Sequence, residues 1–247
     1  MMNDLFDERS NNVATQAVER RQSFIPATAG GFGEGMEGLD QQDLILPRKT
    51  ILQPTSKKDG KEGEFFDNLT NQCVPHIDAV ALRISRTRTL WSGDLSDTRP
   101  ECQSYDAVNG SAYGACDACE FNSDVNRELW DQAGLKRCNR GYLFLCVNTV
   151  DDSLFLLGAM GTSVRPAKVL ISQLVQRRGP AFGAVIRFET AKVVDDKGKY
   201  YVLKPSIAKA LAPAEVAGYR ERFQQIQGVA IHDIDDGTEP EGDAPPF

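Results

Sequence analysis

Several stretches in the middle of the chain have the alternation of apolar and polar residues that is typical of β-strands. Residues 79–91, AVALRISRTRTLW, show it most clearly. The predicted apolar face holds Val80, Leu82 and Ile84, and the opposite face holds Arg83, Ser85 and Thr87.

Two predicted hairpins follow. GYLFLCVN (141–148) and SLFLLGAM (153–160) are apolar at most positions, which indicates two central strands joined through a turn at 149–152. AVIRFETAKVV and KYYVLKPS flank Asp195-Asp196-Lys197-Gly198, a typical turn sequence, and predict the second hairpin.

Helical periodicity appears twice. VRPAKVLISQLVQRR starts at Val164, and Thr162 or Ser163 is placed to cap its first turn. PAEVAGYRERFQQIQ predicts a second helix with Pro213 in its first turn. Short strands with one helix between them and a looped-out insertion predict a mainly β protein with α-helices (α+β). We expect an OB-like small β-barrel, with a split α+β sheet as the alternative.

Charge and composition separate the body of the chain from its ends. Residues 1–43 have 3 basic and 8 acidic side chains, and residues 228–247 have 6 acidic and no basic ones. Both ends are poor in core-forming residues, so we expect a flexible N-terminal segment and a disordered acidic C-terminal tail. The body, 44–227, has 25 basic and 21 acidic side chains, which is compatible with nucleic-acid binding in spite of the net charge of −7.

Four of the six cysteines lie in a segment with few apolar residues, 102–138. Their spacing is Cys102-x13-Cys116-x2-Cys119-x18-Cys138, and the Cys-x-x-Cys pair lets two thiolates on one turn point at one metal ion. The other two cysteines can complete a tetrahedral shell. We therefore expect a zinc-binding insertion whose structural Zn²⁺, rather than a hydrophobic core, holds the segment together.

Three other interpretations of these cysteines remain open: separately buried thiols, a redox Cys-x-x-Cys pair, and disulfides. The N-terminal sequence has no secretory pattern, and no apolar run approaches about 18 residues, so we expect a cytoplasmic protein with reduced thiols. Cys146 lies within an apolar run and is interpreted as a small buried hydrophobic residue. Trp130, Phe144 and Phe155 are interpreted as core residues.

Cationic and aromatic side chains occur together in the body. Binding of single-stranded DNA requires a cationic groove for phosphates and exposed rings on which bases stack. The candidate contacts are Arg83, Arg86, Arg88, Trp91, Arg165, Lys168, Arg187, Lys192, Lys199, Tyr200 and Tyr201. The same cations could form an ordinary solvated surface, and strand alternation would bury one ring of the Tyr200-Tyr201 pair.

The last residues, HDIDDGTEPEGDAPPF, combine acidic side chains with a terminal Pro-Phe. A ring beside the α-carboxylate suits a small basic, apolar pocket on a partner protein. This ending resembles the C-terminal tail of bacterial single-stranded-DNA-binding proteins, although Ala244-Pro245 departs from that pattern. The residues that match it are Asp233, Asp235, Asp236, Asp243, Pro246 and Phe247.

The body is similar in plan to phage single-stranded-DNA-binding proteins, which combine an OB-like barrel, a zinc-bearing subdomain and an acidic C-terminus. Their zinc shell mixes His and Cys, whereas this chain offers four cysteines. The resemblance implies sequence-independent binding and protection of single-stranded DNA in phage replication, recombination or repair, within the cytoplasm of a bacterial host. It also implies that the acidic tip recruits replication or recombination proteins, and it leaves a homo-oligomer open.

A zinc-stabilised protein-interaction or transcription-regulating module that binds no single-stranded DNA is the alternative function. Catalysis is not expected. The chain has two histidines, His76 and His232, and it has no phosphate-binding Gly loop, His-Glu-x-x-His or nucleophile motif.

Overall fold

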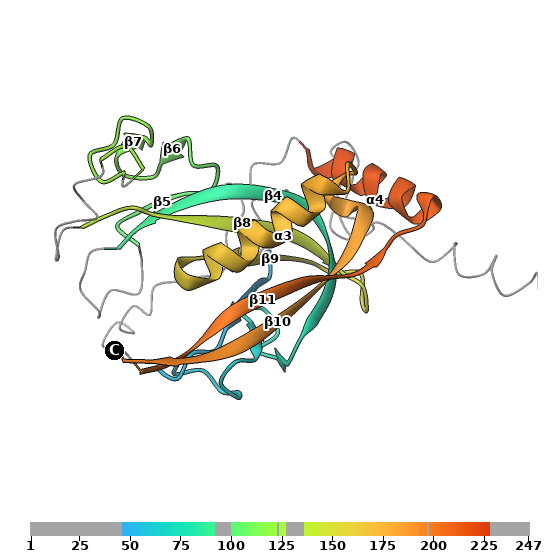
Figure 1. The fold of residues 1–247 in the computed structure, drawn as a ribbon, viewed down its shortest axis with the longest axis horizontal. Helices are drawn as coiled ribbons and strands as arrows, with labels where there is room; N and C mark the ends of the chain where they lie inside the picture. Colours follow the sequence, from blue (N-terminus) through green and yellow to red (C-terminus); the bar gives the residue numbers. More distant parts are fainter. Residues whose placement is uncertain (1–45, 92–99, 123, 127–135, 197, 228–247) are drawn as a thin grey trace, which may run out of the picture.

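The computed structural model describes residues 46–91, 100–122, 124–126, 136–196 and 198–227 (Figure 1). The expected N-terminal segment 1–43 and the acidic tail 228–247 fall outside these residues. The strands are β1 (Arg48–Ile51), β2 (Phe65–Asp67), β3 (Cys73–Val74), β4 (Ile77–Leu90), β5 (Cys102–Ser104), β6 (Asn109–Gly110), β7 (Gly114–Ala115), β8 (Asn139–Asn148), β9 (Leu154–Ala159), β10 (Ala184–Asp195) and β11 (Gly198–Ala210). The helices are η2 (Gly161–Ser163), α3 (Val164–Gln176), η3 (Ala181–Gly183) and α4 (Pro213–Ile226).

The described part of the chain is mainly β. Nine strands form one sheet in the order β11-β10-β4-β8-β9-β1-β2-β3, with β5 paired to the end of β4, and β6 and β7 form a separate small pair. The sheet curls into a half-barrel, which is consistent with the expected α+β, OB-like body (Figure 1). Both predicted hairpins are confirmed as β8–β9 and β10–β11.

The three central strands β4, β8 and β9 are buried on both faces, as their nearly continuous apolar sequences predict. Successive residues point to opposite faces, so Phe144 and Phe155 belong to one apolar cluster and Leu143 and Leu156 to another. Phe144 packs edge to face on Phe188 of β10, with ring centroids 5.6 Å apart. The prediction that Phe144, Phe155 and Cys146 are core residues is confirmed.

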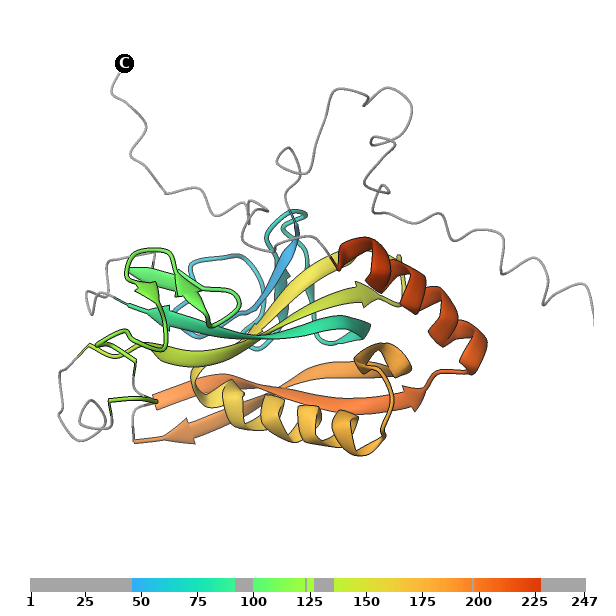
Figure 2. The same ribbon diagram turned by 90° about the horizontal axis from the view of Figure 1, so that it is seen from above.

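Each face of the sheet is covered by one helix (Figure 2). Helix α3 contributes Ala167, Leu170 and Leu174 to the cluster around Phe144. Helix α4 contributes Tyr219 and Ile226 to the opposite cluster. Both predicted helices are thus confirmed. Among the described residues, no helix has the length and apolarity needed to cross a membrane.

The start of α3 differs from the prediction in one detail. Ser163 occupies the N-cap position, but its hydroxyl makes no capping hydrogen bond to the helix. Its Oγ instead accepts a hydrogen bond from the backbone N–H of Leu203 in β11, at 2.9 Å. Ser163 therefore ties the start of the helix to the edge of the sheet.

A side chain joins β11, the edge strand at one end of the sheet order, to the segment that follows β1. The amide of Gln53, just after β1, donates to the carbonyl oxygen of Tyr201 and accepts from its N–H, both at 2.9 Å. These two bonds have the pattern that a neighbouring strand would make. Thr190 also donates to the Gly63 carbonyl oxygen at 2.6 Å, so the hairpin is held against the β1–β2 connection.

The alternation predicted for residues 79–91 is wrong at one point. Val80 and Leu82 belong to the cluster beneath α4, whereas Ile84 packs with the opposite cluster. The register against β8 shifts between Ala81 and Arg83. A β-bulge places an extra residue in one strand, and the faces exchange beyond it.

Candidate functional site

Strand β5 separates two hollows of very different character. Its residues alternate: Cys102 and Ser104 line a small cavity on one side, while Gln103, followed by Tyr105, lines a much larger groove on the other. We call the first the cysteine pocket and the second the central groove. Both are held in place by the pairing of β5 with Arg88, Thr89 and Leu90 at the end of β4.

The central groove has a volume of about 450 Å³. It runs from β1 across the ends of β4, β8 and β9 to β11. Its lining includes Arg48, Lys49, Gln103, Tyr105, Met160 and Tyr201. Gly158 of β9 also lines it, and a Cβ at Gly158 would meet no atom within 4 Å, so this part of the groove floor is open. The groove thus combines two phenol rings, a thioether and two cations.

The cations of the groove are held by neighbours on β2 and just after β5. The Arg48 guanidinium lies over the Tyr105 ring, 5.9 Å from its centroid, and its Nη2 donates to the Tyr105 hydroxyl at 3.4 Å. Lys49 makes an ion pair of 2.5 Å with Asp67, which leaves the Lys49 charge largely neutralised. The pKa of Asp67 lies below its ordinary value: burial opposes this shift, and hydrogen bonds from Lys49 and the Thr70 and Leu69 N–H groups outweigh it.

The β10–β11 hairpin divides its predicted DNA contacts between two faces. Lys192 is paired directly with Tyr201 across the two strands, so these side chains share a face. Tyr200 lies on the opposite face, where its hydroxyl donates to Asp195 at 3.1 Å. Of the adjacent tyrosines, only Tyr201 lines the groove.

Three of the predicted DNA-contacting cations are already paired with carboxylates. Arg187 makes a bidentate contact with Asp78, through Nε at 2.8 Å and Nη2 at 2.6 Å. Arg88 pairs with Asp124, and Lys199 pairs with Glu62. The contact with Arg187 holds the pKa of Asp78 below its ordinary value. To bind DNA, a paired cation must exchange its carboxylate partner for a phosphate, which reduces the free energy gained from the phosphate contact.

The remaining candidates do not form a single patch. The β-bulge puts Arg83 opposite Leu145 on the face of the α4 cluster, and it puts Arg86 opposite Tyr142 on the other face. Burial lowers the pKa of Arg83. Trp91, at the end of β4, is 45% exposed. Arg165 and Lys168 are exposed on α3, away from the residues that line the groove.

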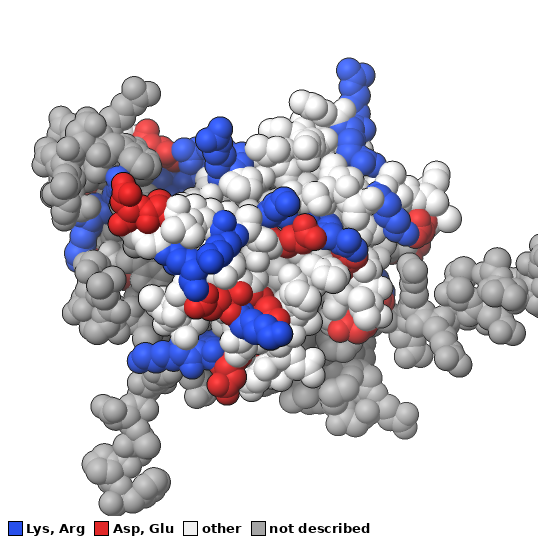
Figure 3. Space-filling model, turned by 60° about the horizontal axis from the view of Figure 1, so that its bottom comes forward, with Lys and Arg blue, Asp and Glu red and all other residues white. Residues whose placement is uncertain are grey.

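The surface charge is mixed. On the face drawn in Figure 3, Lys and Arg side chains lie next to Asp and Glu side chains instead of forming one continuous basic area. On this face the basic side chains are therefore distributed among acidic ones.

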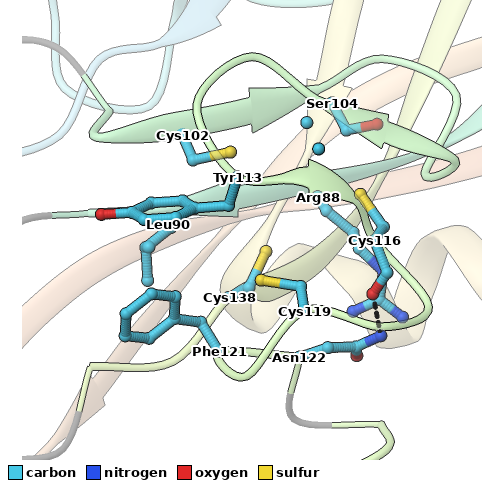
Figure 4. A pocket seen from close by; sticks show the side chains of 12 residues that line it. Arg88, Leu90, Cys102, Ser104, Tyr113, Cys116, Cys119, Phe121, Asn122 and Cys138 are labelled. Carbon is cyan, nitrogen blue, oxygen red and sulfur yellow. Dashed lines mark hydrogen bonds between the residues drawn. The ribbon is translucent and has the colours of Figure 1, made fainter.

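The cysteine pocket brings together all four predicted ligands. Cys102, Cys116, Cys119 and Cys138 line one cavity of about 10 Å³, and their side chains surround it in Figure 4. Cys102, Cys116 and Cys138 are buried. All six cysteines of the chain are free thiols. Residues that are 36 positions apart in the chain thus meet at one cavity, as their spacing predicts.

Short backbone contacts shape this pocket. The Cys138 N–H donates to the Phe121 carbonyl oxygen at 2.7 Å, and the Cys116 N–H donates to Val108 at 2.8 Å. The buried Asn122 amide donates to the Cys116 carbonyl oxygen at 2.6 Å. Gly110 approaches so closely that a Cβ there would lie 2.7 Å from the Cys102 Sγ. The position therefore requires glycine.

Arg88 extends from β4 to the rim of the cysteine pocket. Its Nη1 is buried and has no hydrogen-bond partner among the described residues. Burial raises the pKa of Cys116 and raises that of Cys138 to about 11, although the Arg88 charge opposes both shifts. A redox Cys-x-x-Cys needs a lowered thiol pKa, so the pKa of Cys116 does not favour that interpretation.

The four thiols line one cavity, but their sulfur atoms do not converge on a common metal position. Among the residues that the structure describes, no group of three or more His, Cys, Asp or Glu side chains has the arrangement of a metal site. Zn²⁺ therefore stays a prediction here. Cys73 and Cys146 lie elsewhere: the Cys73 thiol contacts the Asp59 carbonyl oxygen at 3.3 Å, and Cys146 is in the core.

The predicted partner-binding tip could not be placed. Its six residues, Asp233, Asp235, Asp236, Asp243, Pro246 and Phe247, lie outside the described part of the chain. Trp130, interpreted from the sequence as a core residue, also lies outside it.

Sequence reasoning missed Arg48, Tyr105 and Met160 of the groove. Tyr105 could in principle have been noticed from the sequence, because it is an aromatic residue in an otherwise polar segment. It also lies two residues after Gln103, and residues two apart along a strand share a face. Arg48 and Met160 carry no such local signal. Their contribution depends on the parallel pairing of β1 with β9, which joins segments about a hundred residues apart.

No curated protein and no solved structure matches this chain. A family model does match it. The model describes Pam3 phage gp34-like proteins and covers residues 15–227, which include every described strand and helix. Because this match extends over most of the sequence, the chain belongs to the family of Pam3 phage gp34-like proteins.

Proposed function

We propose that this protein binds single-stranded DNA, without sequence preference, along the central groove. The observation that carries the proposal is the composition of that groove: Tyr105 and Tyr201 stand at different parts of one open hollow of about 450 Å³ that Arg48 and Lys49 also line. Aromatic faces with nearby cations are what single-strand binding uses, because every base has a stackable face and every nucleotide has a phosphate.

The position of the groove in the fold supports the same function. In the proposed OB-like barrel, β4, β8, β9, β10 and β11 take the places of the five strands, with α3 between the third and the fourth. OB folds bind oligonucleotides on the face of strands 2 and 3, between the loops L12 and L45. Here L12 corresponds to the cysteine-rich insertion and L45 to the tip of the β10–β11 hairpin. The groove contains Tyr105 from the first and Tyr201 from the part of β11 that follows the second.

The family to which the chain belongs is also compatible with this function. Its description names a phage protein, and single-strand binding in phage DNA replication, recombination or repair, within the bacterial host, fits a protein with no catalytic constellation in its sequence. Each stacked base would contribute about 1–3 kcal/mol. Phosphate contacts would make the affinity fall as salt rises.

The two neighbouring tyrosines of β11 provide a matched test. Tyr201→Leu removes the ring that lines the groove, and Tyr200→Leu removes an equal ring from the opposite face of the same strand. Fluorescence anisotropy of labelled oligo-dT, at low and at moderate salt, should show binding weakened about tenfold by Tyr201→Leu. Tyr200→Leu should leave it close to that of the unaltered protein.

Two results would contradict the proposal. Equal losses in both variants would place the DNA elsewhere on the hairpin. No binding by the unaltered protein at low salt would favour the zinc-stabilised interaction module, and a preference for double-stranded DNA would favour a transcription regulator.

The acidic tail supplies a second prediction. If residues 228–247 fold back onto cations of the body, they compete with DNA phosphates, and DNA binding releases them to recruit replication or recombination proteins. Deletion of 228–247 should then tighten oligo-dT binding in the same assay, most strongly at low salt. Identical affinities with and without the tail would exclude this competition.

A further inference from the structure

We propose that the cysteine pocket binds one soft, tetrahedral divalent cation, Zn²⁺, through Cys102, Cys116, Cys119 and Cys138, and that this ion positions Tyr105 in the central groove. The metal site does not depend on the proposed function, whereas the effect of the ion on the groove rests on that function.

The size and lining of the cavity fit a single ion. A volume of about 10 Å³ holds an atom or one water and excludes an organic ligand. Four thiol side chains line it, and among the described residues no carboxylate does. Thiolates select Zn²⁺ over the hard cations Mg²⁺ and Ca²⁺. The thiols would turn toward the centre to reach Zn–S distances of about 2.3 Å, releasing their protons to solvent.

A second observation points to an anionic occupant. A Zn²⁺ ion with four thiolates carries a net charge of −2, and a buried centre of this charge requires a cationic neighbour. Arg88 lies at the pocket with a buried Nη1 that has no hydrogen-bond partner among the described residues. Ser104 also lines the pocket, where its hydroxyl donates to the Asp106 carboxylate at 2.9 Å. The Arg88 Nη1–H would stabilise the thiolates.

The pocket is also built for close approach of sulfur. Gly110 leaves open the space beside the Cys102 and Cys116 sulfurs, which a Cβ would approach to 2.7 and 3.9 Å. Asn122 holds the Cys116 carbonyl oxygen and lies in a bridge with Cys138. Asn122 thus connects the Cys-x-x-Cys turn, through its side chain, to the last cysteine, through its backbone.

Strand alternation transmits the effect of the ion to the groove. Cys102 and Ser104 face the pocket, so a bond from Cys102 to the ion fixes the strand whose opposite side presents Gln103 and then Tyr105 to the groove. β5 is only three residues long and, among the described strands, pairs with β4. Arg48 holds Tyr105 from the groove side, and the ion would fix the strand that leads to this ring from the pocket side.

The first experiment measures metal in the full chain. Elemental analysis of the purified protein should find one zinc per chain. The reduced, metal-free protein should take up one Co²⁺ and show the absorption of a tetrahedral thiolate centre. Cys102→Ser and Cys138→Ser should lose both signals, and Cys73→Ser, a thiol outside the pocket, should keep them. An unaltered protein that contains no metal and takes up none, or that holds these thiols as disulfides, overturns the site.

The second experiment separates the ion's role from DNA binding. Metal removal by a chelator from the unaltered protein should speed hydrogen exchange of the backbone amides of β5, while exchange in β8 stays slow. The affinity for oligo-dT should fall about tenfold. Unchanged exchange and affinity would overturn the positioning role. A metal-loaded protein that shows the exchange effect but binds no oligo-dT would support the site and contradict the proposed function alone.

Discussion

The sheet around β4, β8 and β9 and the cysteine-rich insertion differ in what they bury. The sheet buries apolar side chains on both faces, including Phe144, Phe155, Leu143 and Leu156. Within residues 100–122, the buried side chains are Cys102, Ser104, Cys116 and Asn122. The small cluster there adds only Leu90, Cys138 and the partly buried Phe121.

This difference indicates two sources of stability in one chain. Burial of apolar area holds the sheet, at roughly 25 cal/mol per Å². The insertion has little such area and depends on hydrogen bonds and on the proposed metal ion. A mutation in one region should therefore have little effect on the stability of the other. The insertion, which buries less apolar area, borders the groove.

The largest expected effect is on the free energy of unfolding. It is tested by comparing two phenylalanines, each of which belongs to an edge-to-face aromatic pair. Phe144→Ala leaves a cavity against Phe188 in the centre of the sheet and should lower the free energy of unfolding by about 3–5 kcal/mol. Phe121→Ala removes a ring that packs on Tyr113, with centroids 5.0 Å apart, in the insertion. It should lower the free energy of unfolding by about 1 kcal/mol or less. Urea denaturation followed by circular dichroism measures both, and similar losses would show that the insertion belongs to the same cooperative unit.

A smaller effect should be confined to the insertion. Asn122→Ala removes the amide that donates to Cys116 and the oxygen that accepts the Asp124 N–H at 3.0 Å. The loss, about 1–3 kcal/mol, should appear as faster hydrogen exchange in residues 102–122. Asn139→Ala, at an exposed position of β8, is the matched control. If Asn122→Ala accelerated exchange across β8 and β4 equally, the separation of the two regions would be wrong.

The smallest expected effect is a pH-dependent change in stability that arises at the periphery of the sheet. Arg187 holds the pKa of Asp78 below its ordinary value. A lowered native-state pKa stabilises the protein above the unfolded-state pKa, about 3.9, and this stabilisation is lost as the pH falls through the lower native value. Asp78→Asn should therefore reduce the urea midpoint near pH 6 and have a smaller effect near pH 3, because part of the stabilisation is lost below the unfolded-state pKa. An equal reduction at both pH values would show that the contact acts through packing rather than charge.

Local pattern was sufficient for much of the fold. The apolar runs that form β8 and β9, the helical periodicity of α3 and the turn at Asp195–Gly198 all have their causes within a few residues, so they could be predicted. The bulge after Ala81 could not, because it depends on how β4 is registered against β8.

The candidate site shows the same division. The spacing of the four cysteines was enough to predict their meeting, because cysteines have few alternatives in a segment without a core. The sequence could not show which cations are free, since Asp78, Glu62 and Asp124 come to Arg187, Lys199 and Arg88 from strands and loops distant in the chain.

The sequence by itself determined the long strands of the two hairpins, both long helices and the acidic end of this protein, because each is a property of neighbouring residues. Only the tertiary structure decided that β5 separates the cysteine pocket from the groove, and that Tyr201 rather than Tyr200 faces this groove. Those outcomes depend on which strands pair and in what register. In a sheet, a shift by a single residue sends every side chain to the other face.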